Sequence, residues 1–261
     1  MRRFLDPSLI LISVCLLLLG LRDAAGSGEF ENYRIPILLY HRFNETVGDS
    51  MTVTMERFES QIRYLHDHNH KFIPLRTLVE ARLKRSPLPE NTVVFTADDG
   101  HRSVYNRLFR LARKYQLPVT LFIYPSAISN ADYAMTWQQL AELKNSGLFE
   151  VQSHTFWHPN FLREKRRLSP TEYDKFASTQ LAQSKKILES KLGGTVDLLA
   201  WPFGIYDDDL IGKAEQAGYL AGFTIEGRHV TPRDHMMTLP RYLMTQVIDM
   251  RMFAELMSAK R

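Results

Sequence analysis

Cysteine is almost absent from this chain of 261 residues, and its single copy, Cys15, lies in an apolar segment near the N-terminus. One cysteine cannot form an intrachain disulfide, and the rest of the chain offers no thiolate to a metal ion. A metal site in the body of the protein would therefore have to use histidine and carboxylate ligands. The lack of cysteine excludes disulfide frameworks and thiolate metal centres there.

The sequence also lacks an apolar run as long as the roughly 20 residues that a membrane-spanning helix needs. An uncharged apolar run at residues 9–21 follows Arg2 and Arg3 and precedes small residues such as Ala24. A basic start, an apolar centre and a small-residue end are typical of a secretory signal, although Asp23 departs from the usual cleavage pattern. We expect residues 1–26 to be a signal peptide, with an uncleaved membrane anchor as the alternative. The protein would then be periplasmic or otherwise extracytoplasmic.

The chain has no large excess of one charge. It contains 33 basic and 29 acidic residues, and its net charge is +4. The densest basic cluster, REKRR at residues 163–167, itself contains an acid and is more typical of a solvated helix or loop than of a nucleic-acid site. We therefore expect no nucleic-acid partner, and membrane association only through the N-terminal segment.

Linker-like tracts, internal repeats and low-complexity segments are lacking too, which favours one domain over residues 27–261. Strand-like and helix-like patterns alternate along that domain. We expect strands at residues 35–40, 71–73, 92–97, 118–124, 149–153, 197–201 and 219–224. We expect helices at residues 55–69, 75–84, 103–115, 137–146, 172–192, 207–217 and 247–258. This alternation predicts an α/β fold with a parallel sheet in a single barrel, and an open doubly wound sheet is the alternative.

Polar residues follow three of the expected strands. The strand at residues 92–97 leads into Asp98 and Asp99, and the strand at 149–153 leads into His154. The strand at 197–201 leads into Pro-Phe-Gly at residues 202–204. Because catalytic groups of parallel α/β folds lie at the carboxyl ends of strands, these three segments should meet at one mouth.

These residues have the chemistry of a metal site. Two adjacent carboxylates, Asp98 and Asp99, repel each other when buried, and a divalent cation would relieve that cost. His154 and His158 are four residues apart, so a helical turn would place both imidazoles on one side. Histidine and aspartate without cysteine suit zinc or another first-row divalent ion. Each motif alone also fits an ordinary Asp-Gly turn or a histidine pair that caps a loop.

The combination is more specific than its parts. It reads Thr-Ala-Asp-Asp-Gly at residues 96–100, His-Thr-x-x-His-Pro at 154–159 and Trp-Pro-Phe-Gly at 201–204. In this order the motifs resemble those of the polysaccharide deacetylases, the carbohydrate esterases with a NodB homology domain, over residues 36–241. The pair Tyr40-His41 and the third motif are most similar to the branch that acts on poly-β-1,6-N-acetylglucosamine of biofilms. The resemblance implies a distorted (β/α)₇ barrel over residues 27–261 and an N-acetylglucosamine polymer as substrate.

The resemblance also implies roles for individual residues. Asp98 would be the general base, and one divalent metal ion would be held by Asp99, His154 and His158. Zinc is expected first, with iron, cobalt and nickel as alternatives. The backbone N–H of Phe203 would stabilise the tetrahedral oxyanion.

Several positions depart from the family pattern. Ala97 stands where relatives usually have phenylalanine, and Ala200 where many have the arginine that orients the base. The C-terminal motif lacks its histidine, which leaves the general acid open. Arg241 lies in that motif, and we expect it to contact the substrate or to support the site by pairing with Asp98.

Other side chains are candidates near the substrate. His41 follows a strand end, and Trp201 adjoins the third motif, so both are expected to contact substrate. His229 and His235 are alternatives for the general acid, although loop histidines are more often ordinary surface residues.

The sequence therefore predicts a metal-dependent hydrolase that removes N-acetyl groups from a β-linked N-acetylglucosamine polymer of biofilm exopolysaccharide. Two alternatives stay open. One is a deacetylase of peptidoglycan, of chitin-type oligomers or of a smaller amide. The other is a membrane-tethered glycan-binding module with little turnover.

Overall fold

The computed structural model describes residues 33–258 of the chain. The expected signal or anchor at residues 1–26 lies outside the described residues. Within residues 33–258, no helix is both long enough and apolar enough to cross a membrane.

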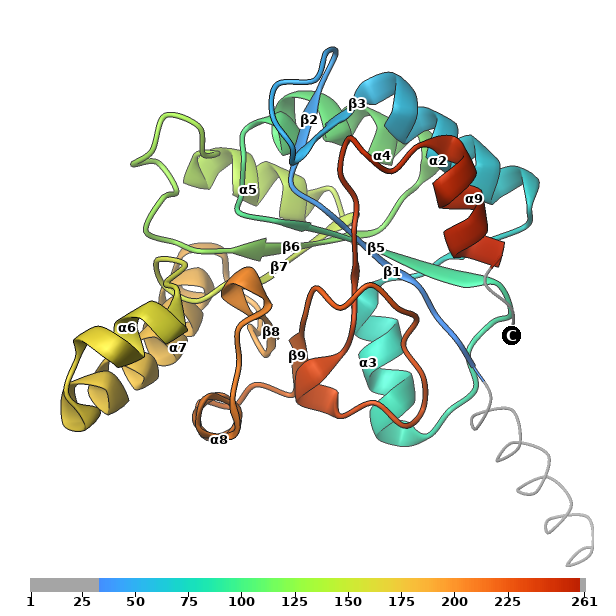
Figure 1. Cartoon of the computed structure of the whole chain (residues 1–261). Coiled ribbons are helices and arrows are strands. Elements are labelled where there is room, and N and C mark those ends of the chain that lie inside the picture. The colour runs from blue at the N-terminus through green and yellow to red at the C-terminus, as the bar shows by residue number, and fades with distance from the viewer. Residues whose placement is uncertain (1–32, 259–261) are drawn as a thin grey trace, which may run out of the picture.

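A curled parallel sheet forms the centre of the fold (Figure 1), with strand order β10-β1-β5-β6-β7-β8-β9 and β4 beside β5. Every pair in this sheet is parallel. The strands are β1 (Ile37–Tyr40), β4 (Lys71–Phe72), β5 (Thr92–Asp98), β6 (Val119–Ile123), β7 (Phe149–Ser153), β8 (Leu198–Ala200), β9 (Ala221–Phe223) and β10 (Tyr242–Leu243). This half-barrel confirms the predicted α/β class and is consistent with a distorted (β/α)₇ barrel.

Helices cover the sheet on both sides. In the view of Figure 1, α2, α4, α5 and α9 lie above the sheet and α3 and α8 below it. The helices are α2 (Met55–Asp67), α3 (Leu75–Lys84), π-helical η1 (Val104–Leu108), α4 (Phe109–Tyr115), α5 (Trp137–Asn145), α6 (Phe161–Arg167), α7 (Pro170–Leu192), α8 (Asp208–Gln216) and α9 (Met250–Ser258), with short 3₁₀ turns η2 (Pro202–Gly204) and η3 (Met236–Thr238). Each of the seven predicted helices is present, and η1 with α4 occupies the segment predicted as one helix.

Three short strands were not predicted: β10 and the small parallel pair β2 (Arg42–Asn44) and β3 (Thr52–Thr54). The strands are only two or three residues long, which is too short for a periodic pattern to emerge. The predicted helices are longer and begin at clear caps. Ser169, for example, forms a capping box with Glu172 at the start of α7.

Alternation along the strands separates two hydrophobic clusters. In β5, Phe95 and Ala97 pack in the outer cluster beneath the helices, whereas Val94 belongs to the inner cluster. Leu75 and Leu78 of α3 also belong to the inner cluster, so α3 fills the inside of the curl. By alternation, Asp98 faces the same interior as Val94, which is why a charged residue ends a strand buried along its whole length.

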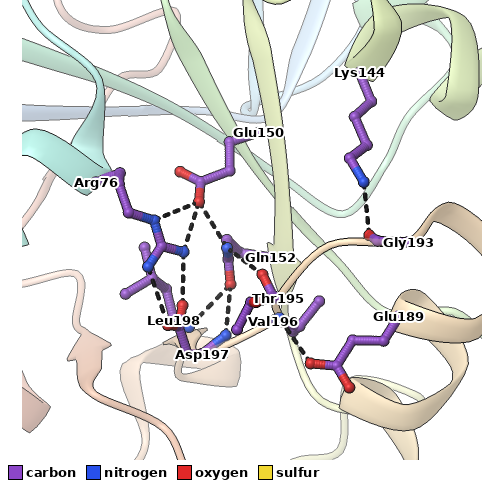
Figure 2. Close-up of polar contacts among 10 residues, drawn as sticks. All are labelled: Arg76, Lys144, Glu150, Gln152, Glu189, Gly193, Thr195, Val196, Asp197 and Leu198. Atoms are coloured by element: carbon purple, nitrogen blue, oxygen red, sulfur yellow. Dashed lines mark hydrogen bonds and ion pairs between the residues drawn. The ribbon is translucent and has the colours of Figure 1, made fainter.

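The amino ends of β7 and β8 are joined by side chains rather than by a continuous ladder (Figure 2), because the two strands pair only at Ser153 and Leu199. Buried Gln152 accepts hydrogen bonds from the backbone N–H groups of Asp197 and Leu198, at 3.0 and 2.9 Å. Arg76 of α3 adds ion pairs to Glu150 and Asp197, at 2.7 and 2.6 Å. This polar network fixes the spacing between β7 and the start of β8.

Candidate active site

The three sequence motifs meet at the carboxyl ends of β5, β7 and β8, as predicted. Asp98 is the last residue of β5, and Asp99 turns the chain away with φ of 72°. His154 directly follows β7, and Phe203 lies in the tight turn η2 after β8. Neighbouring parallel strands place their ends side by side, so residues far apart in sequence form one cluster.

Asp99, His154 and His158 have the geometry of a metal site. One ligand atom from each lies within 4.8 Å of the others. Asp99 Oδ1 lies 3.7 Å from His154 Nε2 and 3.8 Å from His158 Nε2. This oxygen is buried and has no hydrogen-bond partner among the described residues. An uncompensated carboxylate oxygen facing two imidazole nitrogens fits a divalent cation held by two nitrogens and one oxygen.

The orientation of His154 is set by a neighbouring backbone group. Its Nδ1 donates a hydrogen bond to the carbonyl oxygen of Ala200, at 2.8 Å. The donated proton leaves a lone pair on Nε2, the atom that faces Asp99. Burial lowers the pKa of His154 to about 3, so the imidazole is neutral at pH 7, as a metal ligand must be.

Arg241 binds the carboxylate of Asp98 inside the curl of the sheet. Its Nη1 and Nη2 donate to Oδ1 and Oδ2 of the carboxylate, at 2.9 and 2.7 Å. Arg241 also donates from Nε to the carbonyl oxygen of Thr224 and lies over the ring of Phe122. The arginine side chain is fully buried and the aspartate side chain is 2% exposed. A two-point charged pair of this kind fixes both position and direction of a carboxylate.

The two adjacent carboxyls have different electrostatic surroundings. Burial alone would raise the pKa of Asp98, but the charge and hydrogen bonds of Arg241 outweigh it and hold the pKa below its ordinary value. The pKa of Asp99 lies above its ordinary value, chiefly because of burial, and the charge of Asp98 adds to the rise. Asp98 is therefore ionised at neutral pH, whereas Asp99 lacks a comparable cationic partner, and a bound metal would supply one.

Backbone strain is concentrated here. Asp99, Thr155, His158 and Phe203 all have positive φ, between 57° and 72°. The left-handed region costs an L-residue roughly 1–2 kcal/mol, so tertiary contacts must hold these turns. Two such contacts lie in the histidine loop, where Thr155 N–H donates to Ser153 Oγ and His158 N–H to Thr155 Oγ1.

Phe203 lies at the open side of the cluster. Its ring is 55% exposed, and its centroid lies 4.5 Å from that of His158. Hydrogen bonds from Gly204 N–H to Trp201 O and from Ile205 N–H to Pro202 O fix the turn on both sides of it. The expected oxyanion donor therefore belongs to a rigid turn next to the metal ligands.

Two expected substrate contacts are corrected. The ring of Trp201 is completely buried and its Nε1 donates to the carbonyl oxygen of Met237, so it belongs to the core and offers no face to a sugar. Arg241 is also inaccessible to a substrate, because its exposure is 0% and both Nη atoms engage Asp98. The structure shows the other expected role of Arg241, which is its pairing with Asp98.

His41, expected to contact substrate, and the two histidines considered for the general acid lie in different places. His41 directly follows β1, and the pairing of Tyr40 with Ala97 places it next to the end of β5. His41 Nδ1 is buried and has no partner among residues 33–258. His229 instead bonds Tyr242 near the start of β1, and His235 caps η3, so neither lies in this cluster.

Tyr124 is a site residue that the sequence analysis missed. It directly follows β6, and its ring centroid lies 5.4 Å from that of His158. The signal was its position at the very end of an expected strand, close to the position that identified Asp98 and His154. A tyrosine there is less conspicuous, because aromatic residues are also common in cores.

Comparisons with known proteins agree with this geometry. The sequence model of the family described as polysaccharide deacetylase matches residues 85–222. Poly-beta-1,6-N-acetyl-D-glucosamine N-deacetylase of Staphylococcus aureus strain MRSA252 is 26% identical over 198 residues, which are 74% of this chain and 68% of that protein. The protein of the same name from Staphylococcus epidermidis has the same identity and coverage.

Two solved structures share the fold. The deacetylase PplD of Streptococcus pyogenes, in complex with acetate, has a TM-score of 0.77 at 21% identity and covers 86% of this chain and 98% of its own. IcaB of Ammonifex degensii has a TM-score of 0.74 at 22% identity, with coverages of 87% and 97%. Because the family sequence model spans more than half of the chain, the chain belongs to the polysaccharide deacetylase family and is an N-deacetylase that hydrolyses amide bonds.

Proposed function

We propose that this protein is a metal-dependent N-deacetylase of a β-1,6-linked N-acetylglucosamine polymer. The observation that carries the proposal is a buried, ionised Asp98, oriented by Arg241, beside the triad of Asp99, His154 and His158. A base next to an open metal site is the arrangement that metal-assisted amide hydrolysis requires. The names of the Staphylococcus relatives support the choice of polymer.

Asp99, His154 and His158 would hold one divalent metal, and histidine with carboxylate ligands favours zinc, with iron, cobalt and nickel as alternatives. When bound, the metal would lower the pKa of water and polarise the acetamide carbonyl. Three protein ligands leave positions open for both.

Asp98 takes the proton of the water that attacks the acetamide carbon, and Arg241 keeps its carboxylate ionised and aimed. The N–H of Phe203 donates to the oxyanion that develops on the carbonyl oxygen. The C–N bond then breaks, acetate leaves, and the sugar nitrogen departs as an amine that needs a proton.

His41 is assigned to the protonation of that amine. It lies beside the end of β5, and its buried Nδ1 has no partner among the described residues. His229 and His235 are engaged elsewhere. His41→Gln should lower kcat strongly while bound metal per chain is unchanged, and a variant with wild-type kcat would contradict this role.

The first alternative differs from the proposal in its polymer and not in its catalytic residues. A deacetylase of peptidoglycan or chitin-type oligomers would use the same residues with a different groove. A glycan-binding module with little turnover is disfavoured, because a binding protein has no use for an oriented base beside a metal triad.

Free-amine release tests the polymer. The purified full-length protein is incubated with β-1,6-linked N-acetylglucosamine oligomers and, separately, with chitin oligomers of equal length. We expect release from the β-1,6 oligomers and little from chitin. Faster release from chitin would overturn the choice of polymer, and release from neither would overturn the proposed activity.

The N-terminal segment adds an expectation about location. Its basic start and apolar centre support export, with residues 1–26 as signal or anchor and residues 27–261 as the catalytic domain. Fractionation of cells that express the full chain tests this, because a cytoplasmic protein with an intact N-terminus would contradict it.

A further inference from the structure

A cavity of about 370 Å³ lies beside the candidate active site, between the β2–β3 pair and the segment that leads from His101 into η1. Three arginines line it: Arg42, Arg102 and Arg107. The single acid in the lining is Asp49. Basic side chains therefore outnumber acidic ones around this cavity.

The hydrogen-bonding capacity of the lining is also unbalanced. Asp49 pairs with Arg42 and accepts further hydrogen bonds from Met51 N–H and the Thr52 hydroxyl, so its carboxylate is fully engaged. Arg42 Nε is nevertheless buried and has no acceptor in the described part of the chain.

The other two arginines are turned toward solvent. Arg107 pairs with Glu45, whose side chain is 68% exposed and so only weakly competes for the arginine. Arg102 is exposed, and among residues 33–258 no carboxylate forms an ion pair with it. Arg102 and the Nε of Arg42 thus keep free donor capacity at this cavity among the described residues, and a planar carboxylate suits guanidinium groups well.

Aromatic residues connect this cavity to the metal ligands. Tyr124 lies 5.4 Å from His158 between ring centroids, and its hydroxyl is hydrogen-bonded to that of Tyr133. The ring of Tyr133 is 41% exposed and lies parallel to His101, with centroids 6.2 Å apart. His101 itself lines the cavity, so a glycan chain that passes over these rings from the metal centre reaches the arginines.

The segment with Tyr133 is held in place by the loop of the catalytic aspartates. Arg102 N–H donates to the carbonyl oxygen of Tyr133 at 2.8 Å, and Met135 N–H donates to that of Gly100 at 2.9 Å. The backbones at Tyr133 and Arg102 are therefore fixed relative to Asp99 without help from a ligand. A site built in advance of binding loses little freedom when the ligand arrives.

We propose that this cavity binds a carboxylate carried by the glycan on a sugar next to the one that is deacetylated. The inference rests on the proposed function, because it extends the groove of that site. Arg102 is the residue that contacts the carboxylate, and Tyr133 supports the intervening sugar ring. The carboxylate belongs either to an acidic substituent on a β-1,6 polymer or to the lactyl group of N-acetylmuramic acid that carries no stem peptide.

Equilibrium binding tests the inference without turnover. Calorimetry on the full-length protein in chelator uses three ligands: a β-1,6 N-acetylglucosamine oligomer, the same oligomer with O-carboxymethyl groups, and a β-1,4 oligomer that alternates N-acetylglucosamine with N-acetylmuramic acid. Arg102→Gln should weaken one of the two acidic ligands about tenfold and the neutral oligomer less than twofold. Arg110→Gln, an exposed arginine of α4 outside this cavity, is the matched control and should change neither.

The outcomes separate the possibilities. Weakening of the carboxymethyl oligomer supports an acidic β-1,6 polymer, and weakening of the muramic acid oligomer alone supports a peptidoglycan-type chain. Equal weakening of all three ligands by Arg102→Gln, or weakening of none, overturns the inference. The proposed function can fail separately from this inference. A protein that binds the acidic oligomer through Arg102 but releases no amine would contradict only the proposed deacetylase activity.

Discussion

Arg241 holds both carboxylate oxygens of Asp98, at 2.9 and 2.7 Å, although the two residues are 143 positions apart in the sequence. The sheet brings them together, because β10 follows Arg241 directly and pairs with β1, which in turn pairs with β5. The pair is almost fully buried. Arginine thus reaches Asp98 from the position just before β10.

Removal of this arginine should damage both the fold and the base. Arg241→Met leaves a buried carboxylate without its partner, which should lower the free energy of unfolding by about 3–5 kcal/mol at pH 7. Arg241→Lys keeps a charge but loses the two-point contact. The pKa of Asp98 should then rise, and the acidic limb of kcat/KM should move to higher pH. Urea unfolding and a pH profile measure the two effects, and an unmoved acidic limb would contradict the role given to Arg241.

The turn around Phe203 gives a second prediction. Gly204 has φ of 67°, and a Cβ there would lie 2.7 Å from Cγ1 of Ile225, so Gly204→Ala must distort the turn. Activity should fall at least tenfold, because the N–H of Phe203 would be displaced. Gly212→Ala in α8 is the control, since a Cβ there meets nothing within 4 Å and should stabilise the helix by about 0.5–1 kcal/mol. Wild-type kcat in Gly204→Ala would refute the argument.

Much of this site was predictable from the sequence for one physical reason. Parallel strands align their carboxyl ends, so Asp98, His154 and Phe203 could be placed together once their strands were recognised. For Arg241 the sequence left two roles open, substrate contact or pairing with Asp98, because it precedes a strand of only two residues whose place in the sheet no pattern reveals.

Other features were decided by packing that a sequence does not display. Trp201 adjoins a catalytic motif, but Gly222 leaves room for its indole, and a Cβ at Gly222 would lie 2.7 Å from Trp201 Nε1. The charged run at residues 163–167 lies in α6 with most of its side chains exposed, but one of its charged residues, Glu164, is buried. Tertiary contacts outweighed local pattern in both cases.

The stability of the metal-free protein should depend on His154. Its pKa is about 3 in the folded protein and near 6.5 in an unfolded chain, so between these values the unfolded state binds a proton that the folded state does not. The free energy of unfolding should therefore decrease as pH falls below 6.5, by about 1.4 kcal/mol per pH unit from this group. Chelated His154→Gln should show a shallower decrease than wild type. The exposed His66→Gln should match wild type, and identical slopes for all three proteins would contradict the assignment.

The polar network of Figure 2 should matter for stability more than for catalysis. Gln152→Ala leaves two buried backbone N–H groups without acceptors and should cost about 2–4 kcal/mol. Arg76→Met should cost about 1–3 kcal/mol, because Asp197 is only 10% exposed and loses its partner. Lys84→Ala, which removes an exposed pair with Glu80, is the control and should cost less than 0.5 kcal/mol. Equal unfolding midpoints for Gln152→Ala and Lys84→Ala would show that the network contributes nothing.

Metal dependence tests the central claim most directly. The purified full-length protein is stripped with chelator, and free-amine release from β-1,6 N-acetylglucosamine oligomers is measured together with metal content before and after zinc is restored. We predict that release stops without metal, returns at one metal per chain, and stays absent in Asp98→Asn with metal bound. Undiminished release from protein that contains no metal, or full activity in Asp98→Asn, would contradict the account.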